Sequence, residues 1–260
     1  MDTKMHNSIA WDKKVEEGSA YTLPVSSEII ERSKRGDWEI YLTTKKPVPR
    51  DWFPTSLDGV RILCLASGGG QQGPVLAAAG ANVTVIDLSK KQLQQDQMVA
   101  EREGLTVKTV LGDMTDLNMF EDEYFDIIIH PVSNLFVKDV LPVWKEAARV
   151  LKNKGILISG FTNPLLWLFD ETLEEKGILE VKHSIPSSTL DHLPADEVKN
   201  HLDSEQTIEY AHTLEDQIQG QIDAGFVITG FYEDDFGGTR IIDKHIKTFI
   251  ATRAMKMKVD

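Results

Sequence analysis

The 260-residue chain has a single cysteine, Cys64, so an internal disulfide framework is excluded. No stretch approaches the roughly 18 to 20 apolar residues of a membrane span, and the first residues lack the apolar centre of a secretory signal. Basic residues are also scarce, because 28 Lys and Arg stand against 41 Asp and Glu, a net charge of −13. Such a surface does not attract a nucleic-acid backbone or an anionic membrane. We therefore expect a cytoplasmic protein that binds neither nucleic acid nor membrane.

From residue 60 onward, short β-branched runs alternate with helical stretches, and this order predicts a mostly parallel sheet covered by helices. Five strands come first, at residues 61–66, 82–87, 106–113, 125–131 and 155–161. Two later runs are expected to pair as an antiparallel hairpin, at residues 226–232 and 247–254. The turns after parallel strands gather at one edge of a sheet, where open α/β sheets bind ligands. Polar residues in these turns are therefore candidates for a functional site.

Capping residues mark two of the predicted helices. Ser89 followed by Gln92 forms a capping pattern, and Gly104 is the expected end of that helix. Thr213 and Asp216 form a second capping pattern nearer the C-terminus. Three apolar residues recur at helical spacing and are expected to share one face of this later helix: Leu214, Ile218 and Ile222.

The chain divides into segments of different character. Residues 1–57 are rich in aromatic side chains, which indicates an N-terminal helical lid segment that closes on a site; packing of a helix on the sheet is the alternative. Residues 58–254 hold all the predicted strands of the main domain. Between about 163 and 212 the regular pattern is lost and prolines intervene. We interpret this insertion as a cap over the sheet edge.

A glycine-rich turn, LCLASGGGQQGP at residues 63–74, follows the first strand. Glycines let a ligand approach the backbone closely, and the helix that follows offers unpaired amide donors. The spacing of Gly68, Gly70 and Gly73 satisfies the dinucleotide fingerprint, and Asp87 lies 19 residues after Gly68, a suitable place for a carboxylate that accepts from ribose hydroxyls. Taken alone, this turn predicts an adenosine cofactor without choosing between NAD and others, and a tight turn without a ligand is the remaining alternative.

The order of motifs over about residues 58–162 resembles that of the class I S-adenosylmethionine-dependent methyltransferases. After the glycine-rich turn come VIDLS at the second strand, GDMTDL after the third, FDIIIHPVSN at the fourth and RVLKNKGILISGF at the fifth. LCLASGGGQQGP followed by LAAAGANVTVIDLS looks most like a bacterial subgroup of small-molecule type. The resemblance implies an α/β, Rossmann-like fold with a seven-stranded, mostly parallel sheet and helices on both faces. It also implies S-adenosyl-L-methionine as the cofactor.

The resemblance further implies which residues contact this cofactor. The methionine portion is expected at the first turn, the ribose hydroxyls at Asp87, and the adenine at the second and third turns. Asp113 could instead cap its own turn, and Met114 could belong to the core. The residues carried over by position are Ala66, Ser67, Gly68, Gly70, Gln72, Asp87, Leu88, Gly112, Asp113, Met114 and His130.

One position departs from the family pattern. The family usually has an acid two residues before its first glycine, and that place is Ala66 here. The acid is associated with the methionine end of the cofactor. We expect neutral hydrogen bonds from Ser67, Gln71 or Gln72 to take over its contact.

Methyl transfer from a sulfonium is an in-line displacement, so positioning the acceptor and excluding water are expected to carry much of the catalysis. His130, at the end of the fourth strand, is the candidate general base for an acceptor that is protonated at neutral pH; packing against the cofactor is the alternative. Trp11, Asn134 and Trp167 are candidate contacts of the substrate, with ordinary packing or a turn as the alternative reading. No metal-ligand set is predicted.

These features favour a methyltransferase that acts on a small-molecule substrate. The sequence His130-Pro131 stands where enzymes that methylate nucleic-acid bases typically have Asn or Asp before two prolines and an aromatic residue. An NAD-dependent oxidoreductase is an alternative that rests on the glycine spacing and Asp87. A non-catalytic cofactor-binding protein is another, because the acid is missing at Ala66. The oligomeric state stays open between monomer and homodimer.

Overall fold

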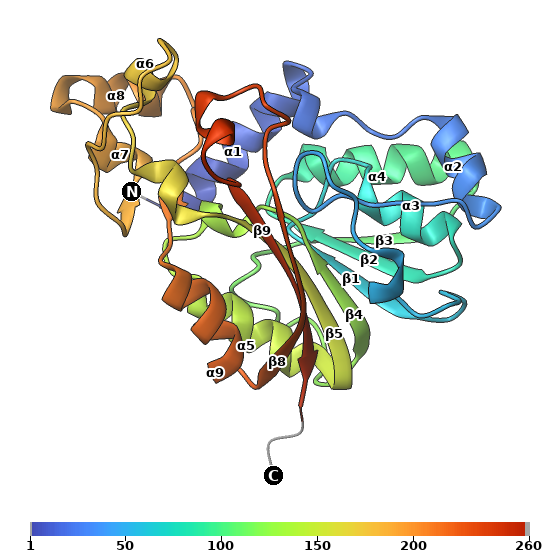
Figure 1. Cartoon of the computed structure of the whole chain (residues 1–260). Helices are drawn as coiled ribbons and strands as arrows, with labels where there is room; N and C mark the ends of the chain where they lie inside the picture. Colours follow the sequence, from blue (N-terminus) through green and yellow to red (C-terminus); the bar gives the residue numbers. More distant parts are fainter. Residues whose placement is uncertain (1, 258–260) are drawn as a thin grey trace.

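The computed structural model describes residues 2–257, which form a seven-stranded sheet in the order β3-β2-β1-β4-β5-β9-β8 (Figure 1). The first five strands pair in parallel, and β9 is antiparallel to both β5 and β8. The predicted mostly parallel sheet and its closing antiparallel pair are thus confirmed. The strands are β1 (Arg61–Leu65), β2 (Asn82–Asp87), β3 (Val107–Leu111), β4 (Phe125–His130), β5 (Leu151–Thr162), β8 (Phe226–Asp234) and β9 (Phe249–Lys256).

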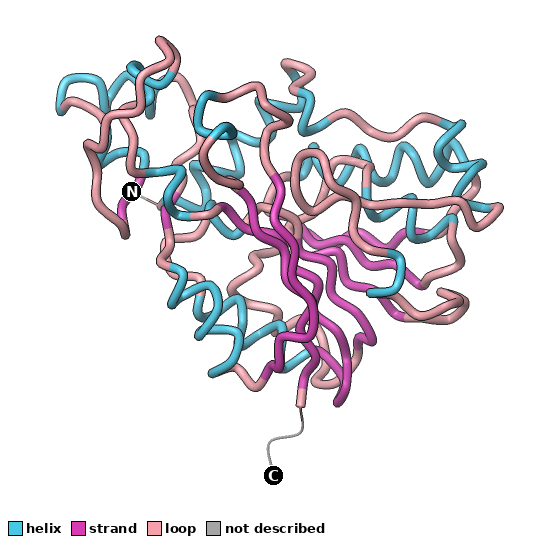
Figure 2. The backbone as a smooth tube through the Cα atoms, viewed as in Figure 1, coloured by secondary structure: helices cyan, strands magenta, loops and turns pink. Residues whose placement is uncertain are grey.

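Helices cover both faces of the sheet (Figure 2). On one face, α3 (Gln72–Ala78) and α4 (Lys90–Glu103) bury Val75 and Leu93 in a core cluster that includes Cys64. On the other face, α5 (Leu141–Val150) and the short α9 (Gly220–Asp223) lie over a second cluster centred on the fully buried Trp144. The alternation of side chains along each strand separates the two clusters, as a parallel sheet buried on both faces requires.

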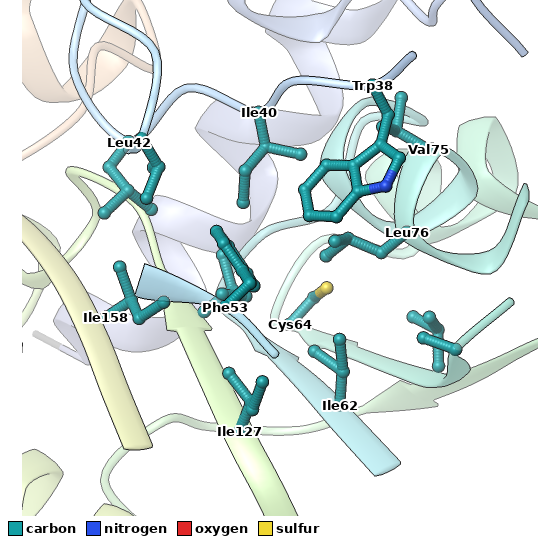
Figure 3. Packing of buried hydrophobic residues seen from close by; sticks show 14 of the residues in the cluster. Trp38, Ile40, Leu42, Phe53, Ile62, Cys64, Val75, Leu76, Ile127 and Ile158 are labelled. Carbon is teal, nitrogen blue, oxygen red and sulfur yellow. The ribbon is translucent and has the colours of Figure 1, made fainter. Parts of the chain in front are cut away.

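The N-terminal region consists of two helices and an irregular segment that belongs to the core. The helices are α1 (Thr3–Glu16) and α2 (Ser27–Lys34). After them, Trp38, Ile40, Leu42 and Phe53 are buried over the strands beside Cys64 (Figure 3). Residues 38–57 therefore cover part of the α3 face of the sheet, and Ile30 of α2 is buried in the same cluster. The division of the chain at residue 57 stays a prediction.

Helix α4 begins and ends where its capping residues predict. The Ser89 hydroxyl accepts from the Gln92 amide at 3.0 Å, and Gly104 ends the helix with a φ of +66°. The capping box is one-sided, because the buried Oε1 of Gln92 has no hydrogen-bond partner among the described residues.

The helix predicted after Thr213 forms, but its buried face is not the apolar one. The Thr213 hydroxyl accepts from the Asp216 amide at 3.0 Å, and a π-helical turn, η5 (Glu215–Gln219), leads into α9. Gln217 and Gln221 are buried, whereas Leu214 and Ile222 are each nearly half exposed. The predicted apolar face is therefore wrong. The physical reason is that two buried polar side chains, Asn134 and Thr252, hydrogen-bond the inward glutamines.

The insertion lies beyond the end of β5, next to α1 (Figure 1). Asn7 of α1 joins the two parts, since its side chain donates to the Ile208 carbonyl at 2.9 Å and accepts from the Ile208 amide at 2.8 Å. Within the described residues, no helix has the length and apolar character needed to cross a membrane. The elements of the insertion are η4 (Pro164–Trp167), α6 (Glu171–Glu174), β6 (Ser187–Ser188), α7 (Thr189–His192), α8 (Ala195–Asp203) and β7 (Tyr210–Ala211). The remaining short helices are η1 (Ala20–Thr22), η2 (Arg50–Trp52), η3 (Asn134–Phe136) and η6 (Ile241–Lys244).

Candidate cofactor and active site

The turn after β1 begins at Ala66, two residues before the first glycine. Ala66 has a φ of +47°, in the left-handed region that normally favours glycine. Counting two residues back from Ala66, rather than from Gly68, reaches Cys64, whose thiol is fully buried. By either count, β1 supplies no acid to this turn.

The glycines of the turn are required by close approach to α4. A Cβ on Gly68 would lie 2.7 Å from the Gln92 Cβ and 3.0 Å from the Asp87 Oδ2, and a Cβ on Gly70 would lie 2.9 Å from the Gln95 carbonyl oxygen. Real side chains do not tolerate such distances to backbone atoms. The turn is thus a bare strip of backbone between β1 and α3, held close to the first turns of α4.

Asp87 stands at the end of β2 with its carboxylate directed at this turn. Oδ2 accepts from the Gly68 amide and Oδ1 from the Ser89 amide, both at 2.9 Å. Burial raises the pKa of Asp87 to about 6, although these hydrogen bonds oppose the shift. Each carboxylate oxygen can accept one further hydrogen bond, as a ribose diol would require.

The second and third turns lie beside Asp87. The Gly112 amide donates to the Asp87 carbonyl at 3.0 Å, which brings the third turn against the second. Asp113 accepts from the Thr115 amide at 2.9 Å, so it caps its own turn, and it also forms an ion pair with Lys4. Met114 is buried in the core cluster of the α5 face. The structure therefore brings Asp87, Gly112 and Asp113 together and leaves Met114 in the core.

Helix α1 lies across these turns (Figure 1). Its Ser8 hydroxyl donates to the Leu88 carbonyl at 2.8 Å, and its Asp12 carboxylate accepts from the Ser89 hydroxyl at 2.6 Å and from the Lys91 amide at 3.0 Å. The Trp11 ring meets Phe136 edge to face, with 5.2 Å between centroids. The sequence patterns did not indicate Asp12, because its partners lie nearly eighty residues away.

Ser67 and Gln72 connect the glycine turn to the N-terminal segment. The Ser67 hydroxyl donates to Gln72 Oε1 at 3.2 Å, and Gln72 Nε2 donates to the Tyr41 carbonyl at 2.9 Å. Beyond this link, a cavity of about 380 Å³ lies between α2, the segment at Trp38 and α3. Gln71 and Gln72 are among the residues that line it.

His130 and Asn134, at the end of β4, are enclosed by the protein. His130 Nδ1 donates to the Leu65 carbonyl at 2.9 Å, so this ring joins the ends of β4 and β1. The ring is fully buried, its Nε2 has no hydrogen-bond partner among the described residues, and burial lowers its pKa to about 4. The Asn134 side chain is also buried and donates to Gln217 Oε1 at 3.0 Å. Neither side chain has the exposure that its predicted role requires.

Trp167 lies in the insertion, away from Asp87 along the sheet edge. It is partly buried, and its indole N–H donates to the Thr162 hydroxyl at 3.3 Å. Of the three predicted substrate contacts, Trp11 and Trp167 keep partly exposed rings near the covered edge.

One buried acid of this region stands outside the motifs of the sequence. Asp96 lies on the inward face of α4, and its Oδ2 accepts from the Gly69 amide at 3.0 Å. The signal was present, because Leu93, Asp96 and Val99 recur at helical spacing and place an acid on an apolar face.

Comparison with known proteins shows the family of this chain. Residues 63–159 match the family model described as a methyltransferase domain. A Bacillus subtilis (strain 168) protein, named uncharacterized methyltransferase YbaJ, is 59% identical over 252 residues, which cover 97% of this chain and 98% of that protein. The chain belongs to the class I S-adenosylmethionine-dependent methyltransferases.

Solved structures share the fold of this methyltransferase at low sequence identity. An S-adenosylmethionine-dependent methyltransferase from Mesorhizobium loti superimposes with a TM-score of 0.61 at 17% identity, over 80% of this chain and 95% of that one. Another from Methanosarcina mazei gives a TM-score of 0.58 at 18% identity, over 84% of this chain and all of that one. These likenesses confirm the Rossmann-like fold.

S-adenosylmethionine is the cofactor of this methyltransferase, and the site fits it in one respect. The Asp87 carboxylate lies beside the glycine turn and has accepting capacity left at its oxygens. When bound, the cofactor supplies a methyl group on a sulfonium. The comparisons do not support an NAD-dependent oxidoreductase or a non-catalytic binding protein.

Proposed function

We propose that this methyltransferase acts on a small-molecule acceptor, which is enclosed between α1, the insertion and the ends of β4 and β5. The observation that carries this proposal is the buried Asn7 side chain, which joins α1 to the insertion through two hydrogen bonds with Ile208. A sheet edge covered in this way suits an acceptor small enough to be surrounded. The net charge of −13 also gives a nucleic-acid acceptor no basic surface.

We infer that the cofactor lies along the glycine turn. Asp87 would accept from the ribose hydroxyls, because its carboxylate faces the turn and has lone pairs to spare. Leu88 and Gly112 would flank the adenine, with Asp113 at its amino group. Ala66, Ser67, Gly68, Gly70 and Gln72 would line the methionine portion.

The protein contributes mainly orientation and exclusion of water in this proposal. His130 is neutral at pH 7 and buried, so we assign it to holding the ends of β1 and β4 together, and not to proton transfer. The acceptor would then present an atom with a lone pair already free at neutral pH. Trp11 and Trp167 are the proposed aromatic contacts of this acceptor, one from each side of the covered edge.

Calorimetric titration with S-adenosylmethionine, S-adenosylhomocysteine and NADH tests the cofactor seat. We expect the first two to bind and NADH not to bind, and Asp87→Ala to abolish or greatly weaken both. Asp116→Asn is a matched control, because Asp116 is an exposed acid near the third turn that does not contact Asp87. Unchanged binding by Asp87→Ala would contradict this seat.

A methyl-transfer screen tests the acceptor class. Purified enzyme with labelled cofactor is incubated with a cell extract divided into small molecules, nucleic acid and protein. We expect label in the small-molecule fraction, and Asn7→Ala, which removes the two hydrogen bonds to Ile208 from the contacts between α1 and the insertion, to reduce transfer. Labelling confined to nucleic acid or to protein would overturn the proposed class.

A further inference from the structure

The glycine turn receives a carboxylate from an unexpected element. β1 ends in Cys64 and Leu65 and offers no acid, but the Asp96 side chain of α4 contacts the turn. Its Oδ2 accepts from the Gly69 amide at 3.0 Å, and Gly69 also donates to the Gln92 carbonyl at 3.1 Å. A Cβ on Gly73 would lie 3.0 Å from Asp96 Oδ1, so this acid fills the space between the turn, α3 and α4.

Burial of the Asp96 carboxyl group at this position is unfavourable in free energy. The residue is fully buried, and its Oδ1 has no hydrogen-bond partner among the described residues. No Lys or Arg of residues 2–257 forms an ion pair with it, whereas buried acids are rarely found without such a partner. The titratable groups that face it are Asp87 from β2 and the Cys64 thiol from β1, and neither supplies a positive charge. Burial, with a smaller contribution from Asp87, raises the pKa of Asp96 to about 8.

We propose that Asp96 is a positioning residue of the cofactor site, which supplies from α4 the acid that β1 lacks and holds the glycine turn for the cationic end of the cofactor. This proposal rests on the glycine turn being the cofactor seat. The two hydrogen bonds that Gly69 donates, to Asp96 and to the Gln92 carbonyl, hold its amide against α4 and so fix the conformation of the glycine turn. A sulfonium bound there in turn provides the positive charge that Asp96 does not find in the free protein.

Proton linkage follows from this arrangement. In the free protein at pH 7.5, Asp96 is mostly protonated, and a nearby cation lowers the pKa of a carboxyl group. Binding of S-adenosylmethionine therefore releases a proton, and its affinity rises with pH through the interval near 8. S-adenosylhomocysteine has a neutral sulfur and releases less. The affinity ratio between the two is expected to rise about tenfold from pH 6.5 to 9 for each pKa unit by which the cation shifts Asp96.

The test is calorimetric titration of the full chain with each of the two ligands, in pairs of buffers that differ in ionisation enthalpy. The variants are Asp96→Asn, Asp87→Ala and the matched control Glu101→Gln, an exposed acid on the same helix. We expect proton release with S-adenosylmethionine in the wild type and in Glu101→Gln. In Asp96→Asn, both this release and the rise of the affinity ratio with pH should be lost.

Each outcome decides one claim. Proton release and a pH-dependent ratio that persist in Asp96→Asn would overturn the role of Asp96. Binding unaffected by Asp87→Ala would overturn the cofactor seat itself and not this residue alone. If Asp96→Asn does not fold, the wild-type profile still decides, because a ratio that stays constant from pH 6.5 to 9 contradicts the proposal.

Discussion

The ligand-free wild-type protein is expected to lose stability at alkaline pH because the buried Asp96 ionises there. Asp96→Asn should not show this loss. Asp96 is fully buried and its pKa is raised to about 8, whereas an aspartate in an unfolded chain titrates near a pKa of about 3.9. Between these two values the folded protein binds a proton that the unfolded chain does not bind. The contribution of this group to stability is therefore greatest at low pH and falls as the pH rises towards 8.

The size of this effect follows from the two pKa values. Each pH unit in that interval lowers the free energy of unfolding by about 1.4 kcal/mol, and the slope flattens above the folded pKa. From pH 6 to pH 9, Asp96 alone should lower the free energy of unfolding by about 2 to 3 kcal/mol. Asp96→Asn cannot titrate, so this loss disappears from its profile, whatever constant offset the unpaired amide introduces.

Urea unfolding of the wild type and of Asp96→Asn at pH 6, 7, 8 and 9 measures the difference. Glu209 contributes equally to both proteins, whereas Asp87 is coupled to Asp96 because its charge helps to raise the pKa of Asp96. The difference between the two curves therefore reports the titration of Asp96 together with this coupling. Parallel curves over the whole interval would show that Asp96 does not titrate there and would refute the reasoning.

Three further changes test other parts of the site. Gly70→Ala combines a left-handed backbone with a Cβ 2.9 Å from the Gln95 carbonyl oxygen. Thermal unfolding should therefore show a free energy of unfolding lower by about 1 to 3 kcal/mol. A stability equal to the wild type would contradict the required close approach. Asp12→Ala removes the acceptor of the Lys91 amide and one attachment of α1. We expect a loss of about 1 kcal/mol of stability, and faster cofactor release in stopped-flow experiments. An unchanged release rate would show that α1 does not retain the cofactor. Activity between pH 6 and 8 should show no inflection from His130, because its folded pKa is about 4, and an inflection near pH 6.5 that vanishes in His130→Gln would contradict its assignment as buried and neutral.

The sheet could be predicted because the residues that favour each strand are neighbours in the sequence. Runs such as NVTVID and FDIIIHP combine β-branched residues with clear boundaries, and both form strands close to the predicted positions. The capping residue Ser89 and the stop at Gly104 are equally local, and α4 begins and ends with them. Such features depend on neighbours within a few residues, so one sequence suffices to find them.

The features that escaped prediction depend on partners far away in the chain. Gln217 and Gln221 are buried because Asn134 and Thr252 hydrogen-bond them, and no local pattern shows those pairings. The same holds for Asp96, which was visible as an acid on an apolar helical face but whose partner is an amide in another turn.

The N-terminal segment shows a similar limit. Its aromatic residues were noted, but without helical or strand periodicity the sequence could not separate a mobile cover from core packing. In the structure, Trp38 and Phe53 are buried against the sheet, whereas the α1 residue Trp11 is partly exposed and meets Phe136 edge to face.

A crystal structure of the protein with S-adenosylhomocysteine tests the central claim most directly. We expect the homocysteine portion on the strip from Ala66 to Gly70, with the ribose hydroxyls donating to the Asp87 carboxylate and α1 lying over the ligand. Density for the ligand away from this strip, with Asp87 still bonded only to the Gly68 and Ser89 amides, would contradict this cofactor seat.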